Sequence, residues 1–285
     1  DRESVRGSGA AAEDIGQMIT TATARTAHGL RLYAVGDIHG DFDGLKRARH
    51  QIADDLLRRP TEDWRVVLLG NYIDRGAKSR EVLALLSALD PAARTYCLAG
   101  NREKCLTDFL ADADAASFYP WLDDGGLATL ASYGIEASSP FDFPDAAARR
   151  DLRVSLAENI PPAQAAFLAG LAHGARFGDY FFAHAGIRPG RPIAAQTVSD
   201  LIWAPGFLDC ATPFEAVVIH GHSPVHSIEV HSNRIAIDTA ASHGPSCLVL
   251  EGADRLLLTD EGPCYLPAPQ PDADGDAIPA PAIAA

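Results

Sequence analysis

The sequence lacks the features of several protein classes. Its five cysteines are an odd number, widely spaced and without a C-x-x-C pair, which argues against a disulfide framework or a structural zinc site. No apolar run approaches the roughly 20 residues of a membrane-spanning helix. The opening stretch, DRESVRGSG, does not have the pattern of a signal peptide. We therefore expect a cytoplasmic protein whose thiols are reduced.

Basic residues are also scarce. Lysine and arginine number 24 against 38 acidic residues, a formal net charge of −14. An acidic surface argues against partners such as nucleic acid or an anionic membrane. It does not exclude phosphorylated ligands, because a metal ion or a few arginines can reverse the sign of the potential locally. The 285 residues, of which 47% are hydrophobic, suffice for one large domain.

The first half of the chain alternates strand and helix patterns. Strands are predicted at residues 30–35 and 65–69 and within RTYCLAGN, and each enters a glycine-containing polar loop followed by a helical segment. Three such units predict an α/β fold. We expect a loose arm or a short peripheral helix at 1–29 and a single domain at 30–264. Residues 111–165 are predicted to form a helical insertion in that domain.

The second half is predicted to be richer in strands. The segments DYFFAHAG, EAVVIHGHSP, HSIEVHSNRIAID and SCLVLEG lie close together, with spacing typical of hairpins. The tail at 265–285 is rich in Pro, Ala and Asp and lacks apolar periodicity, so it is predicted to be disordered.

Five polar clusters beside glycines each follow a predicted strand. They are GDIHGD, GNYIDRG, GNRE, HAG and HGH. In α/β proteins, ligands bind beyond the carboxyl ends of strands, where glycine allows tight turns and close backbone approach. Asp, Asn and His supply oxygen and nitrogen ligands that suit manganese, iron or zinc. One such cluster alone is more often a turn or a structural hydrogen bond, but five in succession indicate a site.

These motifs resemble those of the calcineurin-like metallophosphoesterases. Within that superfamily the sequence is most similar to bacterial serine/threonine phosphoprotein phosphatases and their diadenosine-tetraphosphatase relatives. The resemblance covers residues 30–250 and rests on GDIHGDFDGL, GNYIDRGAKS, GNREKCLTDFL, WLDDGGLATLASYG, FAHAGIRPG, IHGHSPV and IDTAASHG. It implies a β-sandwich flanked by helices, with two divalent metal ions at one edge.

The resemblance also implies ligands for up to two transition-metal ions, manganese, iron or zinc. Asp37 and His39 would hold the first ion. Asn101, His184 and His222 would hold the second, and Asn101 would also contact the substrate phosphate. Asn71 stands where the family has an aspartate that bridges the two ions.

Three further positions concern the substrate. Arg75 matches the family arginine that grips the phosphate, and Arg102 stands where the family has the histidine that protonates the leaving group. Asp74 matches the carboxylate that orients this histidine. In LIWAPGFL, Pro205 takes the place of a second phosphate-binding arginine.

The departures at Asn71, Arg102 and Pro205 weaken a phosphatase site. An amide offers one neutral oxygen, so two metal ions are poorly neutralised and at most one is expected to be well occupied. Arginine cannot act as a general acid, although Arg102 is expected to pair with Asp74 and to contact phosphate.

Two hypotheses for the function follow. The first is a metal-dependent phosphoesterase with impaired activity on phosphomonoesters, most readily phosphoserine or phosphothreonine of proteins. The second is a pseudophosphatase that binds a phosphoprotein or a small phosphoester without turnover.

Overall fold

The computed structural model describes residues 18–90 and 94–269, and within them the strands form two sheets. The first sheet has the order β11-β10-β9-β1-β2-β3. Its strands are β1 (Leu30–Val35), β2 (Asp63–Leu68), β3 (Thr95–Cys97), β9 (Cys247–Glu251), β10 (Asp254–Thr259) and β11 (Gly262–Tyr265). The second sheet has the order β4-β5-β6-β8-β7. Its strands are β4 (Gly174–Phe177), β5 (Tyr180–Ala183), β6 (Val217–His220), β7 (Glu229–Val230) and β8 (Arg234–Ala236).

The two sheets pack against each other through side chains that alternate along each strand. On β1, Leu32 and Ala34 point into the core between the sheets, where they meet Phe182 and Ile219 of the second sheet. The intervening Tyr33 belongs to the cluster on the opposite face. This alternation follows from the two-residue period of a β-strand. The α/β sandwich predicted from the sequence is therefore confirmed.

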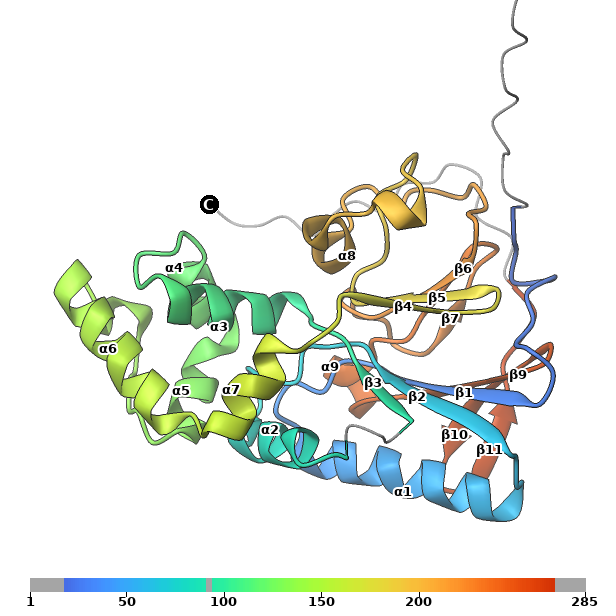
Figure 1. Cartoon of the computed structure of the whole chain (residues 1–285), viewed down its shortest axis with the longest axis horizontal. Helices are drawn as coiled ribbons and strands as arrows, with labels where there is room; N and C mark the ends of the chain where they lie inside the picture. The colour runs from blue at the N-terminus through green and yellow to red at the C-terminus, as the bar shows by residue number, and fades with distance from the viewer. Residues whose placement is uncertain (1–17, 91–93, 270–285) are drawn as a thin grey trace, which may run out of the picture.

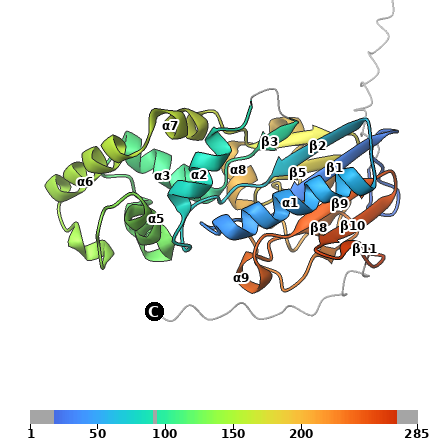
Figure 2. The ribbon, with the colours of Figure 1, turned by 90° about the horizontal axis from the view of Figure 1, so that it is seen from below.

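Helices cover both outer faces. α1 (Phe42–Arg58) and α2 (Ser79–Ser87) pack on the first sheet, where Leu45 and Val82 join its outer core (Figures 1 and 2). α8 (Val198–Trp203) packs on the second sheet, where Leu201 contacts the cluster that contains Phe181. The result is a four-layer arrangement of helix, sheet, sheet and helix.

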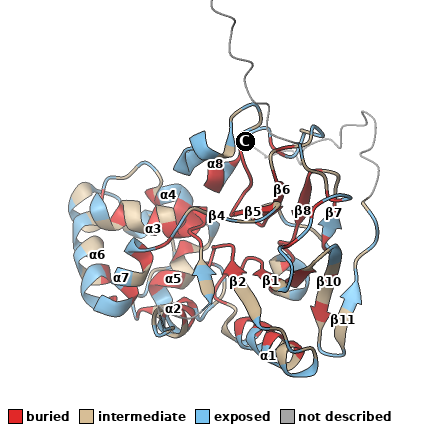
Figure 3. Ribbon diagram, turned by 45° about the vertical axis from the view of Figure 1, so that its right-hand side comes forward, coloured by how far each residue is buried: buried red, intermediate tan, exposed pale blue. Residues whose placement is uncertain are grey.

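A helical lobe stands beside one end of the sandwich, and it includes the segment predicted to be a helical insertion. Residues 111–165, all of them described, contain helices and no strand. The lobe comprises α3 (Asn101–Ala111), α4 (Phe118–Trp121), the π-helical turn η1 (Leu122–Gly126), α5 (Leu127–Ser132), the 3-10 turn η2 (Pro140–Asp142), α6 (Ala146–Asn159) and α7 (Pro162–Ala169). All of these elements except η2 contain buried residues alongside more exposed ones (Figure 3).

The strand pairing in the second half differs from the hairpins predicted by spacing. β5 pairs with β6, and β6 with β8, in parallel. β7 and β8, both within HSIEVHSNRIAID, do form an antiparallel pair, as do β4 with β5, β9 with β10 and β10 with β11. β9 lies in the other sheet, antiparallel to β1. The short turn η3 (Ile193–Ala195), α8 and α9 (Ala240–His243) lie in the connections between these strands. Which strands pair depends on contacts between segments that are far apart in the chain. The spacing of neighbouring segments therefore did not predict these pairs.

The described part of the predicted N-terminal arm is packed rather than loose, and it is not helical. In residues 18–29, Ile19 forms a β-bridge with Phe214, and Ala24 is fully buried between the sheets. The hydroxyl of Thr21 donates to the carbonyl of His231 at 2.8 Å. Residues 1–17 and 270–285, which hold most of the predicted arm and tail, lie outside the described residues. No described helix has both the length and the apolar character to cross a membrane.

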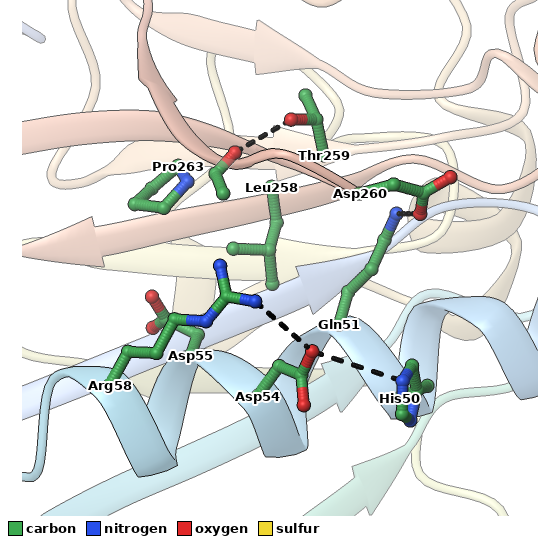
Figure 4. Close-up of a pocket in the computed structure, with 10 residues that line it drawn as sticks. His50, Gln51, Asp54, Asp55, Arg58, Leu258, Thr259, Asp260 and Pro263 are labelled. Atoms are coloured by element: carbon green, nitrogen blue, oxygen red, sulfur yellow. Dashed lines mark hydrogen bonds and ion pairs between the residues drawn. The ribbon is translucent and has the colours of Figure 1, made fainter.

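A polar groove lies between α1 and the β10–β11 hairpin, outside the cluster of motifs (Figure 4). Gln51 donates from Nε2 to Oδ1 of Asp260 at 2.6 Å across it. Asp54 lies 3.6 Å from the guanidinium of Arg58. The buried Asp55 beneath it accepts from Tyr33 and Arg59. The bond from Gln51 to Asp260 joins helix and hairpin, and we assign the groove a structural role.

Candidate phosphoesterase site

The polar clusters meet at one end of the sandwich. The loops after β1, β2 and β3 of the first sheet and after β5 and β6 of the second bring them together. These strands run parallel to their neighbours within each sheet, so their carboxyl ends share an edge. A cavity of about 380 Å³ opens there. It is lined by His39, Asn71, Arg75, Asn101, Arg102, Cys105, Ser117, Pro120, Trp121, Asp124, Trp203, His222 and Pro224.

Asn71 is locked by hydrogen bonds that define which way its amide points. Its Oδ1 accepts from the backbone N–H of Arg102 at 3.1 Å, and its Nδ2 donates to Oδ2 of Asp37 at 2.9 Å. The reverse orientation would place an amide oxygen against a carboxylate and an NH₂ group against an N–H. The amide nitrogen thus occupies the side of residue 71 where a bridging carboxylate would present its second oxygen.

Asp37 is fully buried and both of its oxygens are engaged. Besides Asn71, the backbone N–H of His222 donates to its Oδ1 at 3.2 Å. Burial raises the pKa of Asp37 well above its usual range, and the nearby carboxylate of Asp238 raises it further. Gly221 allows this approach, because a Cβ there would collide with Oδ1 of Asp37.

His39 presents a neutral ring nitrogen to the cavity. Its Nδ1 lies 3.1 Å from the carbonyl of Ile73, so Nδ1 carries the proton and Nε2 has a free lone pair. Nε2 lies 3.6 Å from Asp37 Oδ2 and 3.4 Å from Nη1 of Arg75. Burial, with the charge of Arg75, lowers the pKa of His39 to about 4.

His184, Asn101 and His222 form a second set of donors. Nδ1 of His184 faces the carbonyl of Leu69 at 3.0 Å, which leaves Nε2 unprotonated 2.9 Å from Oδ1 of Asn101. Both atoms can serve as ligands to a metal ion placed beside them. The rings of His184 and His222 are 5.1 Å apart. Burial lowers the pKa of His222 to about 4, with the charges of Arg102 and Arg75 adding to it.

The two sets differ in how well they fit a metal ion. Asn101, His184 and His222 are neutral donors with free lone pairs, a combination suited to one divalent transition metal. The first set fits poorly, because Asn71 and a backbone N–H already hold the oxygens of Asp37. Among the described residues no group of three or more His, Cys, Asp and Glu is placed to bind a metal. The donor set therefore suits one ion better than two.

The predicted pair between Arg102 and Asp74 is wrong. Nη2 of Arg102 contacts the carboxylate of Asp124, and Nη1 donates to the carbonyl of Asp124 at 3.1 Å. Asp74 is instead turned into the helical lobe, where it accepts from Thr129 Oγ1 at 2.6 Å and from Trp121 Nε1 at 3.0 Å. Asp74 has a positive φ of 74°, and each of its carboxylate oxygens accepts one of these two bonds.

Asp124 also contacts Arg75. Nη2 of Arg75 donates to Oδ1 of Asp124 at 3.0 Å. Partial burial opposes ionisation of Asp124, but hydrogen bonds and charge from Arg102 and Arg75 lower its pKa overall. The sequence analysis included WLDDGGLATLASYG among the family motifs without giving Asp124 a role. The sequence signal that could have identified Asp124 is an acidic residue directly before a Gly-Gly turn.

Left-handed backbone conformations concentrate at the site. Six non-glycine residues among those described have positive φ: His39, Asn71, Asp74, Arg75, Ala204 and His222. Five of them come from the motif loops, and the sixth precedes Pro205. Such conformations each cost roughly 1–3 kcal/mol and cluster at functional sites. Pro205 itself is exposed and adds no charge, while its neighbour Trp203 lies against His222 with ring centroids 5.7 Å apart.

Glu103 is a structural residue of the site that sequence reasoning grouped with GNRE without giving it a role. Its buried carboxylate accepts from the backbone N–H groups of Asn71, Tyr72 and Gly100 at 2.7–2.9 Å. It thereby ties the loop after β2 to the start of α3. The signal was a glutamate at the third position of a helix, where it can accept from the first backbone donors.

A scan against family models matches residues 30–254 to the calcineurin-like phosphoesterases. The chain belongs to this family. A symmetrical bis(5'-nucleosyl)-tetraphosphatase from Dechloromonas aromatica (strain RCB) is 41% identical over 71 residues, which span 25% of this chain and 23% of that protein. The chain thus matches less than a quarter of the length of that curated relative.

Solved structures support the fold. A mutant cold-active protein tyrosine phosphatase superposes with a TM-score of 0.57 at 15% identity, covering 85% of this chain and 83% of that one. The enzyme of a psychrophilic Shewanella species gives 0.52 at the same identity and coverage. At this identity the likeness extends to the fold alone. As a calcineurin-like phosphoesterase, the chain has the two-sheet architecture that its motifs implied.

The buried Asp74 gives a testable pH dependence of stability. Burial raises its pKa to about 7, although Thr129, Arg102 and Trp121 favour the charged form. The folded state thus keeps the proton that the unfolded state loses near pH 4, so this contribution to stability falls as pH rises from about 4 to about 7. Asp74→Asn should flatten that slope. It should be more stable than wild type by roughly 2 kcal/mol at pH 8, with little difference at pH 4.

The asparagine side chain of this variant fits the environment of Asp74. Its oxygen can accept from Trp121 while its NH₂ donates to Thr129, whose hydroxyl can turn to Ser79 at 3.1 Å. Asparagine also tolerates a positive φ. Urea unfolding at pH 4 and pH 8 measures the effect, with the exposed Asp123→Asn as control. Parallel pH profiles for wild type and Asp74→Asn would contradict the assignment.

Proposed function

We propose that this calcineurin-like phosphoesterase is a metal-dependent phosphomonoesterase of reduced activity, acting on phosphoserine or phosphothreonine of proteins. The observation that carries the proposal is the convergence of Arg75 and Arg102 on one cavity beside Asn101, His184 and His222. Guanidinium groups bind phosphate oxygens through paired hydrogen bonds. Two guanidinium groups beside a set of metal-binding side chains are the smallest set of groups that a phosphoryl-transfer site needs.

Each group of residues in the cavity would have its own role in the reaction. Asn101, His184 and His222 would hold one divalent ion, manganese, iron or zinc, which polarises the phosphoryl group and lowers the pKa of a bound water. Arg75 and Arg102 orient the phosphate and neutralise its charge. His39 presents a neutral Nε2 to the same cavity, where it can accept a hydrogen bond. Arg102 cannot protonate the leaving group, which supports low turnover.

A second candidate is a binding protein without turnover. It is favoured by the bond between Asn71 Nδ2 and Asp37, which stabilises the first ligand set without any cation. Such a protein would capture a phosphoprotein or a small phosphoester in the same cavity. The two candidates differ in their need for metal and in their turnover.

The experiment is elemental analysis of the purified chain together with hydrolysis of an aryl phosphate in added Mn²⁺ or Zn²⁺. We expect no more than one ion per chain and slow, chelator-sensitive hydrolysis. Arg75→Met should raise KM about 10- to 100-fold, the range of a charge-assisted hydrogen bond. The exposed Arg58→Met serves as a matched control.

Three other outcomes would reject one or both candidates. Phosphoester binding without turnover supports the second candidate and rejects the first. Two tightly bound metal ions per chain together with rapid turnover would contradict the proposal that the site binds one ion and has low activity. If the chain neither binds nor hydrolyses a phosphoester, both candidates are wrong.

A further inference from the structure

Asp124 makes the same kind of contact with the two arginines that a phosphate would make. Its Oδ1 accepts from Arg75 and its Oδ2 from Arg102. A carboxylate and a phosphate both present two oxygens to a guanidinium in a forked arrangement. The position where Arg75 and Arg102 converge is therefore already filled by an anion from the chain itself.

The turn that carries Asp124 is built against Arg75. Gly125 has φ of 113°, and a Cβ there would lie 2.7 Å from Cγ of Arg75. The carbonyl of Gly125 accepts from the backbone N–H of Arg75 at 3.1 Å. This glycine turn interrupts the helix between α4 and α5 and sets Asp124 over the cavity. The contact with the arginines thus follows from the backbone as well as from the charges.

The arginines and Asp124 differ in burial. The side chain of Arg102 is only 7% exposed, whereas that of Asp124 is 56% exposed. Asp124 can therefore swing into solvent without unpacking the lobe, but Arg102 would be left as a buried cation. In addition, Nε of Arg102 is buried without a hydrogen-bond partner among the described residues. An incoming anion with more oxygens than a carboxylate could satisfy it.

We propose that Asp124 is a built-in competitor for the phosphate position, which lowers the affinity of the site for every ligand that must displace it. The inference rests on the proposed function. A ligand must replace the carboxylate at both arginines, and its apparent affinity is reduced by the fraction of molecules in which Asp124 holds them. A phosphomonoester dianion with three free oxygens restores all the lost contacts. A phosphodiester carries one charge and two free oxygens, so it gains no advantage over the carboxylate it displaces.

The test is isothermal titration of the full chain with inorganic phosphate at pH 8, where phosphate is a dianion. Asp124→Asn should bind phosphate about 10- to 100-fold more tightly than wild type, because it removes a competing charge-assisted hydrogen bond. Asp123→Asn is the matched control, an exposed neighbour with the same chemical change, and should bind like wild type. Asp124→Glu keeps the competing charge and should remain weak.

A second anion provides a second readout. Dimethyl phosphate, a monoanion, should bind wild type more weakly than phosphate does, and Asp124→Asn should raise its affinity by the same factor as that of phosphate, because both ligands displace the same carboxylate. Thermal unfolding with and without phosphate checks that each variant is folded, and phosphate should stabilise Asp124→Asn more than wild type.

The outcomes separate this inference from the proposed function. If phosphate binds wild type in a manner that depends on Arg75, but Asp124→Asn binds no more tightly, the competitor role is wrong and the proposed function stands. If neither wild type nor Asp124→Asn binds phosphate, both are wrong. Tighter binding by Asp123→Asn to the same extent would show a general charge effect and would overturn the specific role of Asp124.

Discussion

Combining Asn71→Asp with Arg102→His is expected to raise kcat for an aryl phosphate by about 10²-fold or more over Asn71→Asp alone. Protonation of the leaving group by a positioned acid is typically worth about 10²–10⁴-fold, and Arg102 cannot supply it. Asp74 accepts from Trp121 and Thr129, yet a carboxylate offers about four acceptor positions and can still orient a histidine. Steady-state kinetics of the two single variants and the double variant measure the effect.

The single variant Asn71→Asp should change metal binding more than rate. The bond from the Arg102 N–H to residue 71 can remain, but a carboxylate oxygen would replace the amide nitrogen that lies 2.9 Å from Asp37. Two buried carboxylates at that distance repel unless a cation lies between them. We therefore expect a less stable protein in chelator, a larger stabilisation by Mn²⁺ or Zn²⁺ than in wild type, and metal content rising toward two ions per chain.

Asn71→Gln, which keeps the amide but changes its reach, controls for disturbance of the loop. If Asn71→Asp alone reaches a kcat in the common range of about 1–10³ s⁻¹, the missing acid at position 102 is unimportant. The explanation that Asn71 and Arg102 together limit the rate would then be wrong. If thermal unfolding of Asn71→Asp is unaffected by chelator and metal, residue 71 does not face a cation site.

Glu103→Ala is expected to destabilise the folded state by about 4 kcal/mol or more. Its carboxylate accepts from three backbone N–H groups, two of them on Asn71 and Tyr72. Each buried donor left without an acceptor costs about 1–3 kcal/mol. Glu103→Gln should cost less, about 2–3 kcal/mol, because its oxygen keeps some of these bonds while its NH₂ opposes at least one donor. Urea unfolding measures both.

The exposed Glu158→Gln on α6 is the control for Glu103→Gln, and it should change stability by less than about 0.5 kcal/mol. Because Glu103 also positions the loop of Asn71, phosphate affinity should fall in Glu103→Gln even at temperatures where the protein is folded. A Glu103→Gln variant as stable as wild type would contradict the role of this carboxylate in joining the two loops.

Much of the fold was predictable because it depends on local patterns. The strand predicted at residues 30–35 coincides with β1, and the helical pattern after it corresponds to α1. Alternation within β1 puts Leu32 and Tyr33 on opposite faces of the sheet, and both side chains are buried. Strand pairing was less accessible, because the parallel neighbours β5 and β6 and the antiparallel placement of β9 beside β1 depend on contacts between distant segments.

For the site, the sequence by itself determined which residue types meet at the ends of the strands. The family resemblance of its motifs also predicted that Asn71 and Arg102 leave the site short of a charged bridge and a general acid. Only the tertiary structure decided how these side chains are used. Asp74 accepts hydrogen bonds from Trp121 and Thr129 rather than from Arg102, while the glycine turn at Gly125 brings Asp124 to Arg102 instead. Partners of this kind depend on backbone direction and on segments far apart in the chain, which residue identity and spacing do not encode.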